Sequence, residues 1–207
     1  MRATHTLTLH FPLPSYLSPD LVLERLHAYE PLITPHPYLV RFRRRPVPLA
    51  DLVDDPFFTD TGRRLAAYEV TERIVLLPSG LVGGGGSRLA AVCSKDVRVP
   101  AVFQSFDTGV RCRADAQGGV RVWSTYEVVR RRPSAEGEEE VVSPGAGDWE
   151  LVETATLECA SWMKGFVAKS LETAHRDICR RMIDEMVRTS GKERWPSPQV
   201  SESESHA

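Results

Sequence analysis

The stretch that decides the fold is WMKGFVAKSLETAHRDICRRMIDEMV, residues 162–187. Its apolar residues recur every three or four positions, a spacing that predicts one buried face of an amphipathic helix. They are Met163, Val167, Leu171, Ala174, Ile178 and Met182. The charged residues of the opposite face, which we expect to meet water, are Lys169, Glu172, Arg176, Arg180 and Asp184. We predict a long helix with Ser161 as its N-cap and Gly191 just beyond its last turn.

The chain upstream of this helix alternates polar and apolar residues over short segments, which is typical of half-buried strands. The predicted strands cover residues 4–13, 38–45, 65–77, 88–99, 101–114 (bent around 107–109), 120–131 and 149–159. A short helix is predicted to begin with Ser18 as N-cap and Pro19 as first residue. Its buried residues are Val22, Leu26, Tyr29 and Ile33. The order of these elements predicts an α+β fold with one antiparallel sheet.

Three connecting segments have unusual compositions. Residues 78–87, PSGLVGGGGS, are rich in glycine but lack the Lys-Ser/Thr pair of a phosphate-binding loop, so we predict a hairpin tip or a lid. Residues 133–147 form a long acidic loop. Phe57 and Phe58 interrupt a polar connector, and we expect them to tuck under the domain as a flap.

The overall composition fits one globular domain. The 207 residues are 42% hydrophobic and carry a formal net charge of -2, which argues against a nucleic-acid-binding protein. No apolar run is long enough for a membrane span, and the N-terminus does not resemble a secretory signal. The 4 cysteines and 6 histidines lack metal-binding spacing. We expect one domain over residues 1–190, a disordered tail over 191–207, and a cytoplasmic protein with reduced thiols.

The order of elements resembles that of the START-like, or helix-grip, superfamily, in which a curved antiparallel sheet wraps around one long C-terminal helix. Three stretches are similar to an uncharacterised family of fungal proteins within that superfamily. They are YEVTERI at 68–74 before the LPSG turn at 77–80, FDTGVRCR at 106–113, and Glu158-Cys159 followed by Gly165-Phe166-Val167 and Ala174-His175. The resemblance implies a cavity between sheet and helix, of the kind that polyketide cyclases and lipid-transport proteins use for hydrophobic ligands.

Such a cavity is expected to be mostly apolar, with a few placed polar groups. Its ligand is predicted to contact Gln104, Phe106, Trp123, Val167, Ser170, Leu171, Ala174 and Ile178. Ser170 and Ala174 are small residues in the middle of the helix, where they either let the sheet approach closely or leave room for a guest. His175 lies at the edge of the apolar stripe, and we interpret it as a boundary residue rather than a catalyst.

Acid–base chemistry is the reaction type that the strand residues favour. The predicted catalytic residues are Tyr68, Glu69, Arg73, Tyr126 and Glu127, and Glu72 and Asp107 lie on the same strands or beside them. A carboxyl group in an apolar cavity has a raised pKa and can act as a general acid or base, while tyrosine or arginine can hold a developing negative charge. Strand alternation turns only about half of these residues inward, and the sequence leaves open which half.

The predicted function is that of a cofactor-independent cyclase or isomerase of terpenoid or polyketide secondary metabolism, which folds and orients its substrate. A non-catalytic lipid or sterol carrier is the alternative. A third hypothesis is an interaction domain whose cavity is closed by side chains. The expected partner is a hydrophobic small molecule, with no cofactor, metal, nucleic acid or integral membrane segment. The oligomeric state, a homodimer included, stays open.

Overall fold

The computed structural model describes residues 1–49, 52–53, 55–58, 65–75, 94–131 and 146–193. Its strands are β1 (Arg2–Pro14), β2 (Leu39–Arg45), β3 (Leu65–Val75), β4 (Ser94–Phe106), β5 (Gly109–Ala116), β6 (Val120–Arg130) and β7 (Ala146–Ala160). Its helices are α1 (Pro19–His27) and α3 (Lys164–Glu193), with 3-10 turns at Glu30–Leu32 and Ser161–Met163. The glycine-rich segment 78–87, most of the acidic loop and the end of the tail lie outside the described residues.

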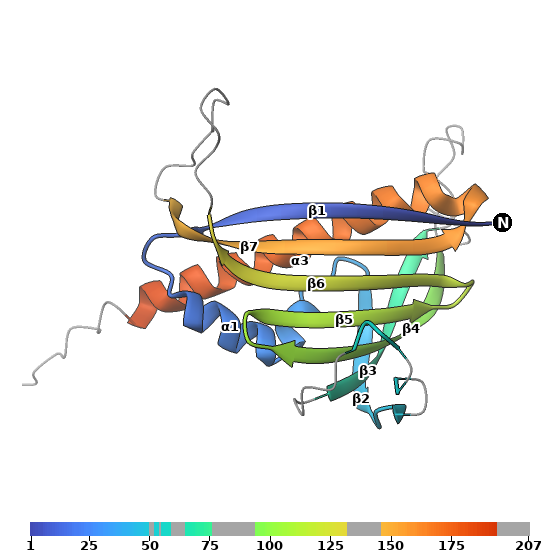
Figure 1. Cartoon of the computed structure of the whole chain (residues 1–207), viewed down its shortest axis with the longest axis horizontal. Coiled ribbons are helices and arrows are strands. Elements are labelled where there is room, and N and C mark those ends of the chain that lie inside the picture. Colours follow the sequence, from blue (N-terminus) through green and yellow to red (C-terminus); the bar gives the residue numbers. More distant parts are fainter. Residues whose placement is uncertain (50–51, 54, 59–64, 76–93, 132–145, 194–207) are drawn as a thin grey trace, which may run out of the picture.

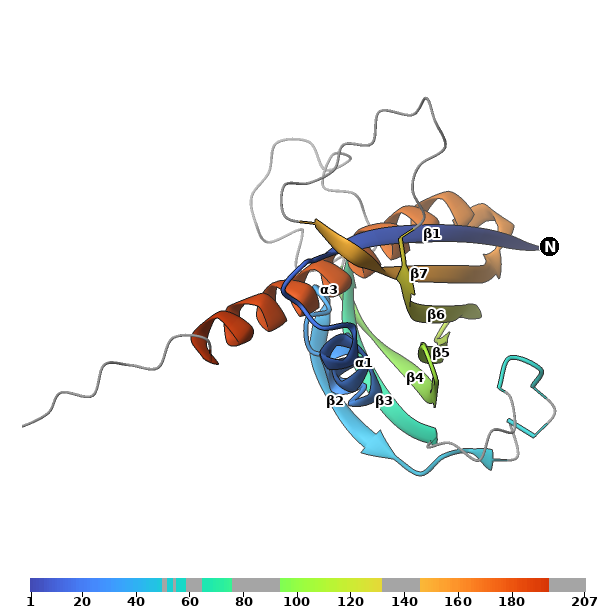
Figure 2. The same ribbon diagram turned by 60° about the vertical axis from the view of Figure 1, so that its left-hand side comes forward.

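The seven described strands form one antiparallel sheet in the order β1-β7-β6-β5-β4-β3-β2. The first strand of the chain, β1, pairs with the last, β7. The edge strands of the sheet are β1 and β2. The sheet curves, and α1 and α3 lie on the same face of it (Figures 1 and 2). We call this the inner face and the opposite one the outer face. The predicted α+β architecture of a curved sheet and a long C-terminal helix is confirmed.

The hydrophobic core lies between the inner face and the two helices. Leu9 and Phe11 of β1 point into it, as the alternation of that strand predicts, and Leu151 of β7 is fully buried there. The helices contribute Val22, Leu26, Ile178, Met182 and Met186. A second, smaller cluster on the outer face joins Ala67 and Val102 to Leu52, with Phe58 partly buried against it.

The start of α1 agrees with the prediction. The Ser18 hydroxyl accepts a hydrogen bond from the Asp20 N–H at 3.2 Å, and Pro19 occupies the first turn. The helix ends at His27, and Tyr29 adopts a positive φ of 64° before the 3-10 turn. Tyr29 and Ile33 are nevertheless buried, as predicted for the inward stripe.

Three predicted boundaries are wrong. α3 continues past Gly191 to Glu193, and Ser161 lies in the preceding 3-10 turn, where its hydroxyl donates to the Met1 carbonyl at 2.9 Å. The predicted break between strands 88–99 and 101–114 also fails, because β4 runs through Pro100. Proline cannot donate to a sheet ladder, but β5 pairs with β4 only from Ala101 onward, so Pro100 lies where that side of β4 is an edge.

Candidate functional site

The two halves of α3 are packed differently against the sheet. From Ala174 onward its inward side chains are buried, and Ile178, Met182 and Met186 belong to the main core. Before Ala174 the inward residues remain only half-buried: Met163, Val167, Ser170 and Leu171. Ala174 itself is 3% exposed. The residues predicted to border a cavity therefore differ along the helix: those of its first half are half-buried, and Ala174 and Ile178 are buried.

A buried carboxylate lies where these two halves meet. Glu153 of β7 is 0% exposed, on the same strand face as the apolar Leu151, Ala155 and Leu157. His175 of α3 forms an ion pair with it through Nδ1. The Cys179 thiol donates to the other carboxylate oxygen at 3.5 Å. Burying a carboxyl group without partners costs free energy, because the group loses its contacts with water. The contacts from His175 and Cys179 partly replace those contacts for Glu153.

The electrostatic balance keeps His175 protonated over a wider range of pH than an exposed histidine. Burial by itself lowers the pKa of His175, but the charge and hydrogen bond of Glu153 and the charge of Glu72 raise it, and the net direction is upward. Tyr126 lies opposite Glu153 in the β6–β7 register. Burial and the neighbouring carboxylate raise the pKa of this tyrosine well above its usual value, so its hydroxyl stays a donor.

A second carboxyl group, that of Glu72 on β3, interacts electrostatically with His175. Burial raises the pKa of Glu72 to about 7, against the opposing effect of the His175 charge. The His36 ring lies beside it, with 3.5 Å between His36 Nε2 and a Glu72 oxygen. Burial, followed by the charge of His175, lowers the pKa of His36 to about 4. We call Glu72, Tyr126, Glu153 and His175, with His36 at their border, the acid–base cluster.

The acid–base cluster combines groups that can donate a proton with groups that can accept one. His175, whose pKa is raised, contacts the Glu153 carboxyl group, burial raises the pKa of Glu72 to about 7, and Tyr126 stays a neutral donor because its pKa is raised. Groups whose pKa lies near the working pH are the most effective general acids and bases. Strongly perturbed titratable groups that converge in an apolar setting are characteristic of functional sites. Within the cluster, Glu153 and His175 are in contact and Tyr126 lies beside Glu153, so a proton can be accepted and donated there.

The structure divides the predicted catalytic residues between the two faces of the sheet. Tyr126 belongs to the acid–base cluster. Tyr68 also points inward, but it packs against Phe42 and Phe103 in another part of the core, and burial raises its pKa. Glu69, Arg73 and Glu127 are outer-face residues. Glu69 pairs with Arg43 at 2.9 Å and Arg73 with Asp96 at 2.8 Å, while the Thr108 hydroxyl donates to Glu127 at 3.4 Å.

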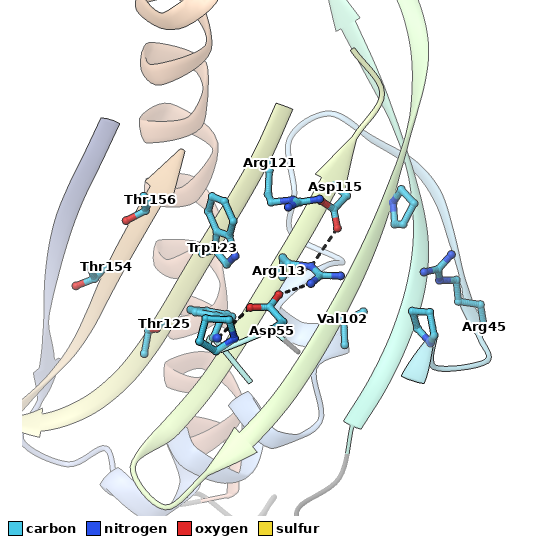
Figure 3. A pocket seen from close by; sticks show the side chains of 14 residues that line it. Arg45, Asp55, Val102, Arg113, Asp115, Arg121, Trp123, Thr125, Thr154 and Thr156 are labelled. Atoms are coloured by element: carbon cyan, nitrogen blue, oxygen red, sulfur yellow. Dashed lines mark hydrogen bonds and ion pairs between the residues drawn. The ribbon is translucent and has the colours of Figure 1, made fainter. Parts of the chain in front are cut away.

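The predicted ligand contacts divide in the same way. Val167, Ser170, Leu171, Ala174 and Ile178 follow the inward side of α3, and the last two are buried. Gln104, Phe106 and Trp123 lie on the outer face instead. Arg111 lies over the Phe106 ring at 5.1 Å and Arg121 over the Trp123 ring at 5.6 Å, and Figure 3 shows Trp123 on the side of the sheet away from the helix.

Sequence reasoning missed Glu153, the residue on which the cluster is built. Its signal is present in the alternation of residues 151–159, where a carboxylate occupies one position of an otherwise apolar row. His175 was predicted at the edge of the apolar stripe, as a boundary residue rather than a catalyst, and the sequence did not reveal its ion pair with Glu153. Within the described residues, no three histidine, cysteine, aspartate or glutamate side chains are grouped as a metal site would require.

Comparisons with known proteins bear on the family of the chain and on its fold. Residues 2–188 match the model of a family described as "Domain of unknown function (DUF7053)". No curated protein matches the chain. Among solved structures, the chain is similar to TTHA0849 from Thermus thermophilus, with a TM-score of 0.50 and 11% sequence identity, over 91% of this chain and 99% of that one. The likeness concerns the fold. In the part of the chain that the structure describes, no helix has the length and apolar composition needed to cross a bilayer.

Proposed function

The chain belongs to the DUF7053 family, and we propose that it binds an apolar small molecule between the inner face of its sheet and the first half of α3. The acid–base cluster then moves a proton on that molecule. The observation that carries the proposal is the fully buried Glu153 carboxylate, which meets His175 where the packing of α3 loosens. We propose in addition that the fold is START-like, which is supported by the order of its elements and the curvature of the sheet.

The apolar character of the ligand follows from its surroundings. Val167 and Leu171 present half-buried aliphatic side chains, and Ser170 between them is a small, half-buried residue. Ala155 and Leu157 face the same interior from β7. Sites of this composition bind mainly apolar molecules, and a few polar groups fix their orientation.

The reaction class that suits the cluster is proton transfer without oxidation or reduction. One carboxylate accepts a proton from a carbon next to a carbonyl, and a protonated neighbour returns a proton at another atom, which shifts a double bond or completes a ring closure. Glu153 and Glu72 are the candidate bases, and His175 and Tyr126 are candidate donors to the oxygen on which negative charge develops. A low-dielectric interior strengthens each of these interactions. No cofactor takes part in such a step.

Binding is tested first with Nile red, a neutral probe whose fluorescence rises in apolar sites. Ser170→Trp should fill the space beside α3 and weaken binding at least about tenfold. Lys169→Trp places the same side chain on the exposed side of the helix and is the matched control, expected to bind as wild type does. Equal binding by both variants and wild type would locate the probe elsewhere.

Catalysis is tested with hydrogen exchange at carbon. The protein is incubated in D2O with apolar enones of increasing size, beginning with cyclohexenone, and deuterium incorporation is followed by mass spectrometry. We expect exchange above the level of boiled protein, and its loss in Glu153→Gln and His175→Asn. Exchange that persists at wild-type rates in both variants would remove the cluster from the reaction.

A carrier of apolar molecules is the second candidate, and two exposed aromatic residues favour it. Trp162 is 85% exposed and Phe166 is 49% exposed at the start of α3, next to the half-buried residues where the ligand is proposed to lie. Aromatic side chains in such places suit contact with a membrane interface. Nile red binding without any deuterium exchange, together with transfer between vesicles that falls in the Trp162→Ser, Phe166→Ser double variant, would establish this function instead.

A further inference from the structure

A separate hollow of about 1200 Å³ lies on the outer face of the sheet. Its floor is formed by side chains of β4 to β7, among them Val102, Trp123 and Thr154, and its wall by Pro48 and residues 55–57. Figure 3 shows Arg45 at one end of the hollow, across Val102 from Arg113, with Trp123 and the threonines toward the other end. α3 lies behind the sheet, so this hollow is distinct from the acid–base cluster.

The wall is anchored to the floor by ionic contacts. Arg113, a buried residue of β5, pairs with Asp55 and with Asp115, the latter at 3.1 Å. Arg111 donates to the Phe57 carbonyl at 3.2 Å. These contacts fix residues 55–57 over the sheet, so the hollow is built into the fold rather than formed by a loose loop.

Arg45 is the unusual residue of this hollow. Its Nε is buried and has no hydrogen-bond partner, and no ion pair of Arg45 occurs among the described residues. The other two arginines of the hollow, Arg113 and Arg121, are paired with aspartates. Three arginines therefore face two aspartates, and the excess positive charge is at Arg45. Its surroundings within the hollow include the apolar side chains of Pro48, Pro100 and Val102.

A partly buried guanidinium without an anion is unfavourable, because burial removes water that no protein group replaces. We propose that this corner of the hollow binds a small amphiphilic anion. Its carboxylate or phosphate group pairs with the Arg45 guanidinium, whose fork of N–H donors fits such oxyanions, and its apolar body packs on Pro48, Pro100 and Val102. This site does not depend on the function proposed for the inner face.

Hexanoate, hexyl phosphate and hexanol test the site, because they share an apolar chain and differ in the head group. We expect saturable shifts of the Arg45 Nε–H and Val102 methyl NMR signals with hexanoate, hexyl phosphate or both, and none with hexanol. Whichever of the two anions binds more tightly identifies the preferred head group. Arg45→Gln should weaken its binding about tenfold or more, the loss expected for one charge-assisted hydrogen bond.

Arg44→Gln is the matched control, since Arg44 is the next residue of β2 and is exposed. It should bind as wild type does. Pro48→Glu provides a second test, because a carboxylate beside Arg45 should occupy the place of the anion and abolish binding. Ser170→Trp, which fills the inner site, should leave these shifts unchanged and so separates the two proposals. Equal shifts with hexanol, or undiminished anion binding in both Arg45→Gln and Pro48→Glu, would overturn the site.

Discussion

At the scale of single residues, Glu153 places a carboxyl group at a position where the alternation of β7 would otherwise place an apolar side chain. Its carboxylate is the main reason that the pKa of the buried His175 is raised despite desolvation. In Glu153→Gln, desolvation is no longer outweighed by that charge, and we expect the pKa of His175 to fall below its ordinary value of 6.5.

The measurement is an NMR titration of the His175 ring signals in wild type and variant. Glu172→Gln is the matched control, because Glu172 is an exposed residue of α3 that pairs with Arg176 at 2.8 Å. It should leave the titration of His175 as it is in wild type. A His175 pKa that does not move in Glu153→Gln would mean that the ion pair is not what holds the proton.

Glu72 provides the clearest dependence of stability on pH. The pKa of its carboxyl group is about 7 in the folded protein and 4.5 when exposed. Between these values the folded state keeps a proton that the unfolded chain has lost, so the free energy of unfolding falls as pH rises through this window. Glu72→Gln removes that loss. Relative to wild type, the free energy of unfolding of the variant should rise by about 3 kcal/mol between pH 4.5 and pH 7.

Urea unfolding at intervals of pH measures this difference, and subtraction of wild type removes contributions from other groups. Glu24→Gln, at an exposed position of α1, supplies the comparison, and its difference from wild type should stay flat over the same window. The depressed pKa of His36, about 4, acts in the opposite direction and adds stability as pH rises toward 6.5. A flat difference for Glu72→Gln would place this carboxyl group in water.

The strand residues show where sequence reasoning reaches its limit. Alternation identified the two sides of β3 and β6 correctly, yet it did not say which side meets the helix, because both sides of residues 65–77 mix polar and apolar types. In the structure, the inward side of these strands carries Tyr68, Glu72 and Tyr126. The outward side carries Glu69, Arg73 and Glu127. Burial on the outer face, as at Ala67 and Val102, comes from a distant segment, which no local pattern reveals.

At the scale of elements, the stripe on α3 predicts one continuous buried face, but the structure divides it at Ala174. Met182→Ala lies in the packed half and should lower the free energy of unfolding by about 3 kcal/mol, since it leaves a cavity in the core. Val167→Ala lies in the half-buried part of the helix and should lower the free energy of unfolding by about 1 kcal/mol or less. Urea unfolding compares the two, and equal losses would mean that α3 is packed along its whole length.

Element boundaries depend on contacts that lie far apart in the sequence. The start of α1 was predictable because the Ser18–Pro19 pair acts locally. The course of β4 through Pro100 was not, because it depends on where β5 stops pairing with it. Similarly, the Ser161 hydroxyl donates a hydrogen bond to the Met1 carbonyl, 160 positions away in sequence, and does not cap the helix that it precedes.

At the scale of the whole molecule, the sheet separates two chemically different regions. Its inner face carries the core and the acid–base cluster, and its outer face carries the anchored wall and Arg45, whose Nε has no hydrogen-bond partner among the described residues. The wall is attached by the Asp55–Arg113 pair, a long-range contact that joins a connecting segment to β5. Asp55 also accepts a hydrogen bond from the Phe57 N–H at 2.9 Å, which an asparagine can preserve.

Asp55→Asn therefore removes the ion pair and keeps the local turn. We expect hydrogen exchange of residues 52–58 to accelerate about tenfold or more, while exchange of the β-strand amides and the midpoint of urea unfolding change little. Hydrogen–deuterium exchange with mass spectrometry resolves this segment from the strands. Asp115→Asn is the comparison, since Arg113 keeps Asp55 in that variant and the wall should stay in place. If the strands and the wall segment open together in Asp55→Asn, the outer face shares the stability of the core and the wall is not an independently anchored unit.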